Sequence, residues 1–363
     1  MSRILGKQDI MEVLYGVTLL AGGGGGPLKT ALDVLESMSE EETKLSLYQV
    51  EELNADDYAV MVACLGSPIK MTVEGFGISE CYAVEGFIKE LKKEGKALKY
   101  IYSGEYGGTN TFVPMFAAIK LGMPFVDLDG EGRAVPELNT GLQPIYGIPT
   151  SPMVLANNAG DVMVVYTKDP MDDKAAEIIA RQMCIAYDMK IAFSTWVINK
   201  EQMVNLVPGA ITKAQEVGKI ILDSKLKKED IAEKLFKSVG LKELFSGTVT
   251  NVDLLAEGGF DYGLTTFKSQ NGKEYFIDFK NENLVARDED GNILMVVPEI
   301  ISMINVETYQ PLTNAEIRVG MNVSVGAAPA AENWWKIPEG FDCWKQCLEL
   351  VGYTGGPVRY KNI

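Results

Sequence analysis

The chain has 363 residues and carries 34 Lys and Arg against 50 Asp and Glu, a formal net charge of −16. This acidity would repel a phosphate backbone, which argues against nucleic acid as a partner. The sequence contains no histidine, which excludes Ser–His and Cys–His mechanisms and histidine-ligated zinc sites. A chain of this length is expected to form two domains with separate cores.

The cysteine count and the apolar pattern bear on the compartment. Five cysteines, an odd number spread along the chain, indicate a reducing environment with free thiols. The opening residues lack the pattern of a signal peptide, and no apolar run reaches the ~18 residues that a membrane span needs. We therefore expect a cytoplasmic protein that binds neither membrane nor nucleic acid.

The first predicted helix leads directly into a run of glycines. Apolar residues recur at helical spacing from Ile10 to Leu20, and Pro27 begins a second helix over 28–38. The run lacks the preceding strand of a Rossmann motif and the Gly-Lys-Ser/Thr of a Walker A loop, so we expect no nucleotide. Free backbone N–H groups can instead bind an anion or an oxyanion; the alternative is a tight connection between two helices. The predicted ligand contacts are Gly23, Gly24, Gly25 and Gly26.

Short apolar strands then alternate with helices. The predicted strands cover 45–50, 58–65, 98–102 and 124–128, the predicted helices 80–93 and 112–121, and 154–156 and 162–167 are expected to add strands. This alternation indicates an α/β fold with a mainly parallel sheet. Ligands bind beyond the carboxyl ends of parallel strands, so the loops at Gly66-Ser67-Pro68, 103–105 and 127–130 are expected to line one crevice.

The pattern changes after Asp169-Pro170. Helices are predicted over 172–189, 209–224 and 228–239, and the chain is strand-rich from Leu244 onward. Asn271-Gly272 and Asp290-Gly291 are typical hairpin turns. The sequence therefore predicts an N-terminal α/β domain over 1–168, followed over 169–363 by a helical connector and an α+β domain rich in β-strands.

An acidic motif follows the last parallel strand. Asp127 and Asp129 flank one residue and would share a strand face. Two carboxylates so close together either raise the pKa of one of them or bind a cation between them. With Glu131 and Glu137 nearby, oxygen ligation of a divalent metal such as Mg²⁺ or Mn²⁺ is one interpretation, and an Asx turn with helix capping is the other. Arg133 would either pair with these acids or hold an anionic group of a substrate.

Two further segments are candidate ligand contacts. Glu105, Thr109 and Asn110 lie in a glycine-rich turn before a helix, where helix capping is the alternative role. Asn281 and Glu282 lie between two predicted strands, where a hairpin turn is the alternative.

Several of these segments together resemble the S-methyl-thiohydantoin desulfurase-like family. They are the glycine run, Glu-Tyr-Gly-Gly-Thr-Asn-Thr at 105–111, Asp-Leu-Asp-Gly-Glu-Gly-Arg-Ala-Val-Pro-Glu-Leu at 127–138, Asn-Glu-Asn-Leu within 279–286, and the stretches 297–301 and 318–325. The resemblance covers nearly the whole chain in order. It implies an α/β domain before a β-rich domain, and an association with hydantoinase chemistry in which one branch exchanges sulfur for oxygen on a thiohydantoin ring. Asn139-Thr140 stand where the family usually has Gln-Met, and the histidine that many relatives carry shortly after is absent.

The leading hypothesis is an enzyme acting on a hydantoin-like or thiohydantoin-like cyclic ureide. A carboxylate would activate water, Arg133 would hold an anionic substituent or developing charge, and the glycine N–H groups would act as oxyanion donors. The candidate catalytic residues are Asp127, Asp129, Arg133, Glu105 and Glu137, with Asp127 or Asp129 as base or, together, as metal ligands. The candidate substrate contacts are Gly23 to Gly26, Thr109, Asn110, Asn281 and Glu282.

Two alternatives remain open. The chain could be a non-catalytic small-molecule-binding or scaffolding partner of a hydantoinase-type hydrolase, or a metal-dependent amidohydrolase with oxygen ligands. Trp334-Trp335 and the apolar β-rich domain predict a homo-oligomer.

Overall fold

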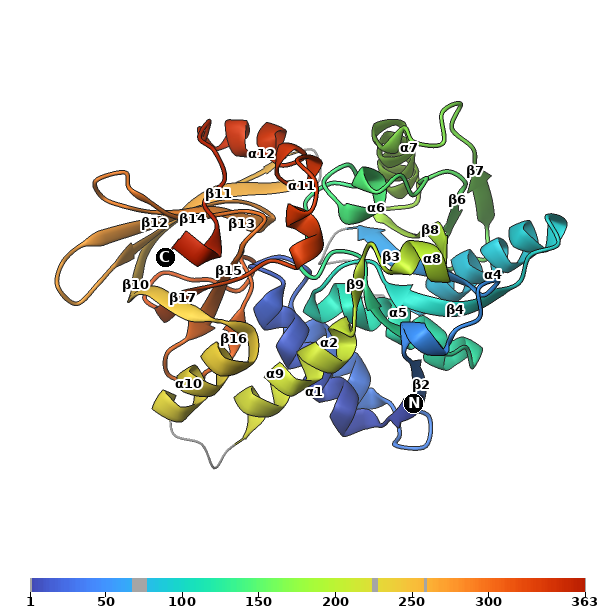
Figure 1. Ribbon diagram of the computed structural model, residues 1–363, viewed down its shortest axis with the longest axis horizontal. Helices are drawn as coiled ribbons and strands as arrows, with labels where there is room; N and C mark the ends of the chain where they lie inside the picture. The colour runs from blue at the N-terminus through green and yellow to red at the C-terminus, as the bar shows by residue number, and fades with distance from the viewer. Residues whose placement is uncertain (1, 67–76, 224–227, 258–259, 363) are drawn as a thin grey trace.

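The computed structural model describes residues 2–66, 77–223, 228–257 and 260–362, and is built around two sheets. Figure 1 shows the first sheet, with its covering helices, beside the second. The first sheet contains β1 (Arg3–Leu5), β2 (Leu45–Tyr48), β3 (Tyr58–Gly66), β4 (Leu98–Ser103), β5 (Phe125–Asp129), β6 (Met153–Ala156), β7 (Val162–Val165), β8 (Lys190–Asn199) and β9 (Val207–Pro208). The second contains β10 (Lys242–Glu257), β11 (Phe260–Lys268), β12 (Glu274–Lys280), β13 (Glu282–Asp288), β14 (Ile293–Val296), β15 (Ile300–Asn305), β16 (Pro311–Leu312) and β17 (Asn322–Ala328).

Helices cover the first sheet and connect it to the second. They are α1 (Lys7–Leu20), α2 (Leu28–Ser37), α4 (Ile78–Lys93), α5 (Gly108–Leu121), α6 (Leu142–Ile145), α7 (Asp173–Ala186), α8 (Lys200–Met203), α9 (Ala210–Leu222), α10 (Lys228–Val239), α11 (Glu339–Asp342) and α12 (Lys345–Leu350), with 3₁₀ turns at Val50–Glu52, Glu332–Trp335 and Tyr360–Asn362. No helix in the described part of the chain is long and apolar enough to cross a membrane.

The first sheet is parallel at its centre and antiparallel at its margins. Its order is β1-β2-β5-β4-β3-β8-β6-β7, with β9 beside β5. The pairs β2–β5, β5–β4 and β4–β3 are parallel, whereas β1, β6, β7, β8 and β9 join in antiparallel fashion. The second sheet is antiparallel throughout, in the order β14-β13-β12-β11-β10-β17-β15-β16. The predicted fold class is therefore confirmed, including the strands expected at 154–156 and 162–167.

The chain returns to the first sheet after the predicted boundary at 168. β8 lies between β3 and β6, so residues 190–199 are part of the first sheet although they follow the boundary. The sequence pattern cannot show this, because the order of strands in a sheet depends on pairing between distant segments. The domain boundary itself stays a prediction.

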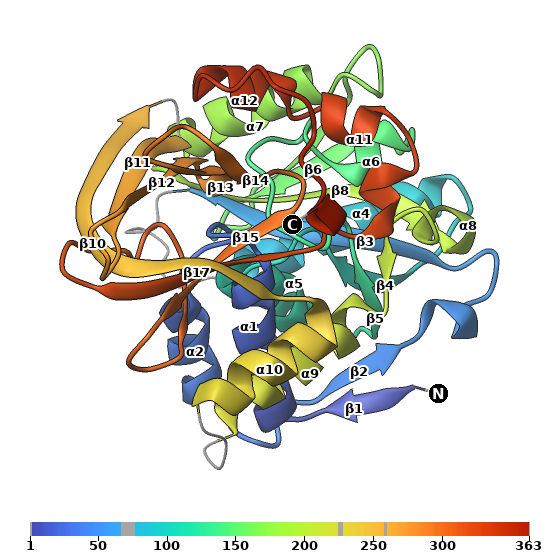
Figure 2. The same cartoon turned by 60° about the vertical axis from the view of Figure 1, so that its left-hand side comes forward.

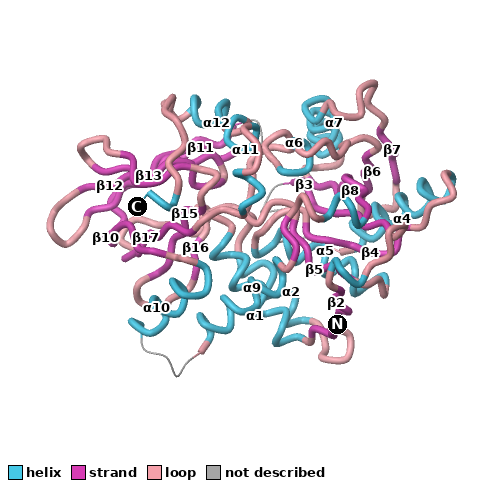
Figure 3. The backbone as a smooth tube through the Cα atoms, in the orientation of Figure 1, coloured by secondary structure: helices cyan, strands magenta, loops and turns pink. Residues whose placement is uncertain are grey.

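Helix α1 packs closely against α9 and leads into the space between the sheets. A Cβ atom on Gly16 would lie 1.8 Å from the carbonyl oxygen of Ala214, and one on Gly218 would lie 1.7 Å from that of Glu12. The Ser302 hydroxyl of β15 donates a hydrogen bond to the carbonyl of Leu19 (2.6 Å). Figures 2 and 3 show α1 and α9 beside the second sheet. These contacts fix the point at which α1 ends and the glycine run begins.

Trp334 belongs to the interior of the chain. It is fully buried, and its indole N–H donates to the carbonyl of Glu131 (2.8 Å). Trp335 is partly exposed and stacks with the guanidinium of Arg359, 4.3 Å from the ring centre. Trp334 therefore offers no exposed surface for contact with a second copy of the chain, and homo-oligomerisation stays a prediction.

Candidate active site

A cavity of about 880 Å³ lies where the two sheets meet. The predicted ligand contacts that line it are Gly23, Gly24, Gly25, Gly26, Glu105, Asn110, Glu137, Asn281 and Glu282. Residues at the ends of three neighbouring strands also contribute, namely Gly66 at the end of β3, Gly104 after β4 and Glu131 after β5. This is the common crevice expected at the carboxyl ends of parallel strands. Ser67 and Pro68 lie outside the described residues.

The glycine run is held in place by hydrogen bonds that its carbonyl groups accept. The Gly22 carbonyl accepts from the Asn283 N–H (2.9 Å), and the Gly23 carbonyl accepts from the Asn314 N–H (2.8 Å). The Gly25 carbonyl accepts from the N–H groups at the start of α5. Within the described residues, the N–H groups of Gly23 to Gly26 have no protein acceptor. Both domains therefore hold the loop while its donors remain available to a ligand.

Close packing explains why this loop consists of glycines. A Cβ atom on Gly24 would lie 2.0 Å from the Oε1 atom of Glu282, and one on Gly25 would lie 2.4 Å from the Cα atom of Gly107. A larger residue at position 24 would displace the Glu282 side chain, and a larger residue at position 25 would push the loop away from the backbone of Gly107.

Glu282 is presented by a tight turn between β12 and β13. Asn281 forms the turn with a φ of 57°, and its N–H donates to the Asp261 carbonyl while its side-chain oxygen accepts from the Asp261 N–H. The Asn314 side chain donates to the Asn281 carbonyl (2.8 Å). Glu282 is 3% exposed and its Oε2 atom has no partner among the described residues. Burial, with the charge of Glu105, raises the pKa of Glu282 well above its usual range.

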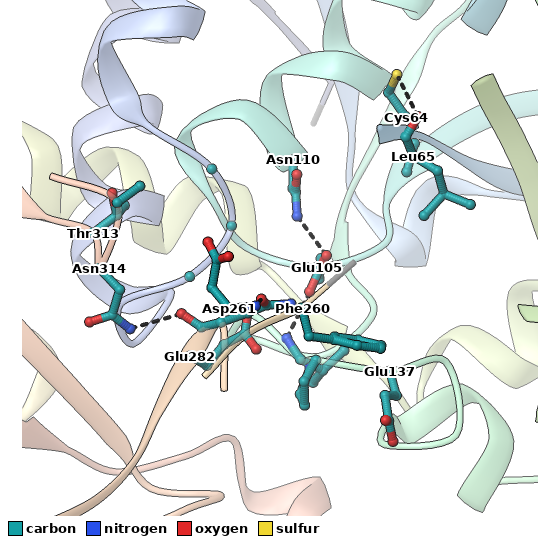
Figure 4. Close-up of a pocket in the computed structure, with 18 of the residues that line it drawn as sticks. Cys64, Leu65, Glu105, Asn110, Glu137, Phe260, Asp261, Glu282, Thr313 and Asn314 are labelled. Atoms are coloured by element: carbon teal, nitrogen blue, oxygen red, sulfur yellow. Dashed lines mark hydrogen bonds between the residues drawn. The ribbon is translucent and has the colours of Figure 1, made fainter. Parts of the chain in front are cut away.

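Glu105 faces the same cavity from the β4–α5 turn. Its two oxygens accept from the Asn110 side chain (2.6 Å) and from the Val135 N–H (2.7 Å). Figure 4 shows Glu105 and Asn110 facing each other in the cavity. Burial raises the pKa of Glu105 to about 8, although the Val135 N–H lowers it. A carboxyl group with such a pKa exchanges protons readily near neutral pH.

Glu131 is a third carboxyl group at this edge and is 1% exposed. Its Oε2 atom accepts from the Leu142 N–H (2.7 Å), and Oε1 has no partner among the described residues. Burial raises the pKa of Glu131 well above its usual range.

Arg133 lies behind the cavity lining. It is fully buried, its Nη1 donates to the carbonyls of Pro298 (2.7 Å) and Glu299 (3.1 Å), and its guanidinium stacks on Trp344 at 4.5 Å. Burial lowers the pKa of Arg133 to about 10, while the Glu282 charge opposes this. In this geometry Arg133 joins the two sheets and supplies positive charge near the buried acids.

Asp127 and Asp129 each hold backbone in place. Asp127 accepts from the N–H groups of Ile211 (2.8 Å) and Thr212 (3.0 Å) at the start of α9, and from Gln49 (2.9 Å). Asp129 accepts from the N–H groups of Glu131 and Gly132, as in the Asx turn considered above. Burial raises the pKa of Asp129 to about 7. Neither aspartate is among the residues that line the cavity.

The metal prediction finds no supporting cluster in the described residues. They contain no group of three or more His, Cys, Asp or Glu side chains that could hold a metal ion. Ligation by Asp127 and Asp129 therefore stays a prediction.

Two remaining predicted contacts pair with protein groups. The Thr109 hydroxyl donates to the Pro27 carbonyl (3.1 Å), so this side chain secures the glycine loop from outside the cavity lining. Glu137 lines the cavity and pairs with Lys280, which is 1% exposed.

Unusual backbone conformations gather at the cavity. Met189, Trp196 and Asn281 have positive φ values of 65°, 49° and 57°, and all three line it. Trp196 occupies an irregularity in the β3–β8 pairing between Ala59 and Met61. Such conformations are costly for large side chains and concentrate at functional sites.

Comparison with known families identifies the family of this chain. A model described as S-Me-THD-like, N-terminal domain, matches residues 8–167, and one described as S-Me-THD-like, C-terminal domain, matches residues 171–359. The chain belongs to the S-Me-THD-like family. The resemblance found in the sequence is thereby confirmed.

A solved structure shows the same fold. The crystal structure of a protein from Chromobacterium violaceum superposes with a TM-score of 0.87 at 23% identity, over 99% of this chain and 100% of the other. At this identity the similarity supports only the fold of the S-Me-THD-like chain and carries no information on its function. No curated protein matches the chain closely.

Sequence reasoning missed part of the S-Me-THD-like cavity. Val252, Leu254 and Ala256 of β10 and Asn314 line it but were not predicted as ligand contacts. The alternating pattern at 252, 254 and 256 places them on one strand face, but nothing local shows what that face meets.

Proposed function

We propose that this S-Me-THD-like chain hydrolyses the carbon–sulfur bond of a thiohydantoin-like ring, replacing sulfur with oxygen. The observation that carries the proposal is a pair of carboxyl groups, half-buried Glu105 and buried Glu282, beside the free N–H groups of the glycine loop. Two carboxyl groups with different environments can divide the roles of base and acid. The family membership supports the choice of ring.

The proposed reaction on an S-methylated thiohydantoin balances with one water. Glu105 removes a proton from the water as its oxygen bonds to the ring carbon, and that proton passes to the ring nitrogen as the C=N bond becomes single. Glu282 then protonates the sulfur as the C–S bond breaks, and it recovers the hydroxyl proton as the new C=O bond forms. The products are a hydantoin and methanethiol.

The glycine N–H groups stabilise negative charge on the ring in this scheme. Donors fixed before the reaction cost no reorganisation, and losing one such donor typically lowers turnover about 10²–10³-fold. Asn110 and Val135 hold the base in position. The product is a substrate for a ring-opening hydrolase, so functional association with a hydantoinase-type enzyme forms part of the proposal.

The test is thiol release from S-methyl-thiohydantoin, with sulfide release from 2-thiohydantoin measured in parallel. We expect loss of the ultraviolet absorbance of the ring together with an equal amount of free thiol. Glu105→Gln and Glu282→Gln should each release thiol at least about 100-fold more slowly, because acid–base catalysis typically contributes 10²–10⁴-fold. Ring binding without release of thiol or sulfide would instead support the non-catalytic partner hypothesis.

A further inference from the structure

The β10–β11 hairpin forms a wall of the cavity that the proposed chemistry does not use. Pairing of β10 with β17 ends at Thr248, opposite Asn322, whereas pairing with β11 continues to Glu257, opposite Phe260. Beyond Thr248, β10 is therefore an edge strand whose one neighbour among the described residues is β11, with β12 next to β11, and this part reaches the cavity. Figure 2 shows the long, curved β10 with β11 beside it at the left of the view.

One face of this hairpin is directed into the cavity. Val252, Leu254 and Ala256 line it, and alternate residues of a strand share a face. Gly263 pairs with Leu254, and a Cβ atom on Gly263 would lie 2.4 Å from the ring of Phe279, which also lines the cavity. The inward face of the hairpin is therefore apolar and is backed by an aromatic ring.

At its end the hairpin contacts helix α7 and its own sheet neighbour β12. The Phe260 ring lies 4.1 Å from the guanidinium of Arg181 on α7 and 4.3 Å from the ammonium of Lys280 on β12. Arg181 is in turn held by Glu177 (2.6 Å). Contacts from two elements therefore keep the hairpin over the cavity.

Leu254 is nevertheless 60% exposed, because the space that it faces is not filled by protein. Apolar side chains gain stability when a ligand covers them. The lining disfavours an anionic group, since among the described lining residues seven are acidic (Glu105, Glu131, Glu137, Glu177, Glu257, Asp261 and Glu282), against Arg181 and Arg318. Arg181 is already paired, and Arg318 donates to the backbone carbonyls of Ala315 and Ile317.

We propose that the inward face of the β10–β11 hairpin, centred on Leu254, determines specificity by binding an apolar substituent on the ring ligand. This inference rests on the proposed function for the identity of the ring. It adds that the preferred ligand is a hydantoin or thiohydantoin with an apolar side chain, which Val252, Leu254 and Ala256 cover.

The chain supplies a matched control for the test. Leu255 follows Leu254, is 59% exposed, and is on the opposite face of the strand, outside the cavity lining. Leu254→Ser and Leu255→Ser therefore make the same chemical change at equal exposure on opposite faces, and both should fold.

The measurement is the calorimetric Kd of hydantoin, 5-benzylhydantoin and 5-(2-carboxyethyl)hydantoin with the full chain. We expect wild type to bind 5-benzylhydantoin at least about tenfold more tightly than hydantoin, since a buried apolar group contributes discrimination of this order. Leu254→Ser should lose most of that gain and bind hydantoin within about twofold of wild type, whereas Leu255→Ser should keep the gain.

Three results would overturn the inference. They are equal effects of the two substitutions, no gain from the benzyl group in wild type, or tighter binding of the carboxyethyl ligand, which would direct attention to Arg318. If thiol release and hydantoin binding persist in any of these cases, the specificity proposal alone fails. If no ring ligand binds wild type, both proposals fail.

Discussion

The Oε1 atom of Glu282 lies against the backbone of Gly24, so closely that a Cβ atom on Gly24 would be 2.0 Å away. Glu282 comes from the second sheet and Gly24 from the loop after α1. A carboxyl group and a set of free N–H donors are thus brought together only where the two parts of the chain meet.

Gly24→Ala should displace the Glu282 carboxyl group. Overpacking of this kind typically costs about 1–3 kcal/mol of stability, and we expect ring turnover to fall below detection. Thermal unfolding and thiol release measure the two effects. Gly356→Ala is the control, because a Cβ atom there would meet nothing within 4 Å. Normal turnover in Gly24→Ala would show that the position of the Glu282 carboxyl group does not matter for the reaction.

Glu105 should make both turnover and stability depend on pH. Because its pKa is raised from 4.5 to about 8, the folded state keeps a proton that the unfolded state releases. The contribution of protonated Glu105 to the free energy of unfolding is fully present below pH 4.5 and is lost as the pH rises towards 8. As the base, it should also make kcat/KM rise with pH up to about 8.

Glu105→Gln tests both effects, with the exposed Glu339→Gln as its control. The free energy of unfolding of Glu105→Gln should fall less between pH 5 and pH 8 than that of wild type. If the variant shows the same dependence of the free energy of unfolding on pH as wild type, and the same pH profile of kcat/KM, Glu105 is not the base.

Asp127→Asn should destabilise the fold more than it slows the reaction. The substitution weakens the cap on α9, and losing a cap costs about 0.5–2 kcal/mol. We expect a lower melting temperature, with thiol release retained at temperatures where the variant is folded. Asp290→Asn, an exposed aspartate, is the control. Loss of turnover with an unchanged melting temperature would instead favour the base or ligand role predicted from sequence.

Lys280→Met should be strongly destabilising. It leaves the Glu137 carboxylate without its partner, and breaking a buried ion pair typically costs about 3–5 kcal/mol. The double substitution Lys280→Met, Glu137→Gln should recover part of this loss, because no unpaired charge remains. Chemical denaturation of both variants measures the difference. Equal stability of the single and double variants would show that the pair contributes little.

The sequence was sufficient for features that depend on local pattern. Alternating strands and helices placed Glu105 and the 127–130 loop at the carboxyl ends of neighbouring strands, and the structure brings Glu105 to one cavity with Glu131, the residue after that loop. The glycine run between two helices was likewise visible as a loop with free N–H groups. These conclusions need only periodicity and the rule for parallel sheets.

The partners of the aspartates could not be predicted in this way. Asp127 caps helix α9 by accepting from the N–H of Ile211, 84 residues later in the chain, and no local pattern encodes that contact. The same holds for the cavity face of β10, since Leu254 comes to line the cavity only after the whole chain has folded. Such relationships arise from tertiary packing.

The most direct test of the central claim compares thiol release from S-methyl-thiohydantoin by wild type, Glu105→Gln and Glu282→Gln. The account predicts stoichiometric methanethiol and hydantoin from wild type, and at least a 100-fold slower reaction from each folded variant. Release by both variants at the wild-type rate, or no release by wild type from this ring or from 2-thiohydantoin, would contradict it.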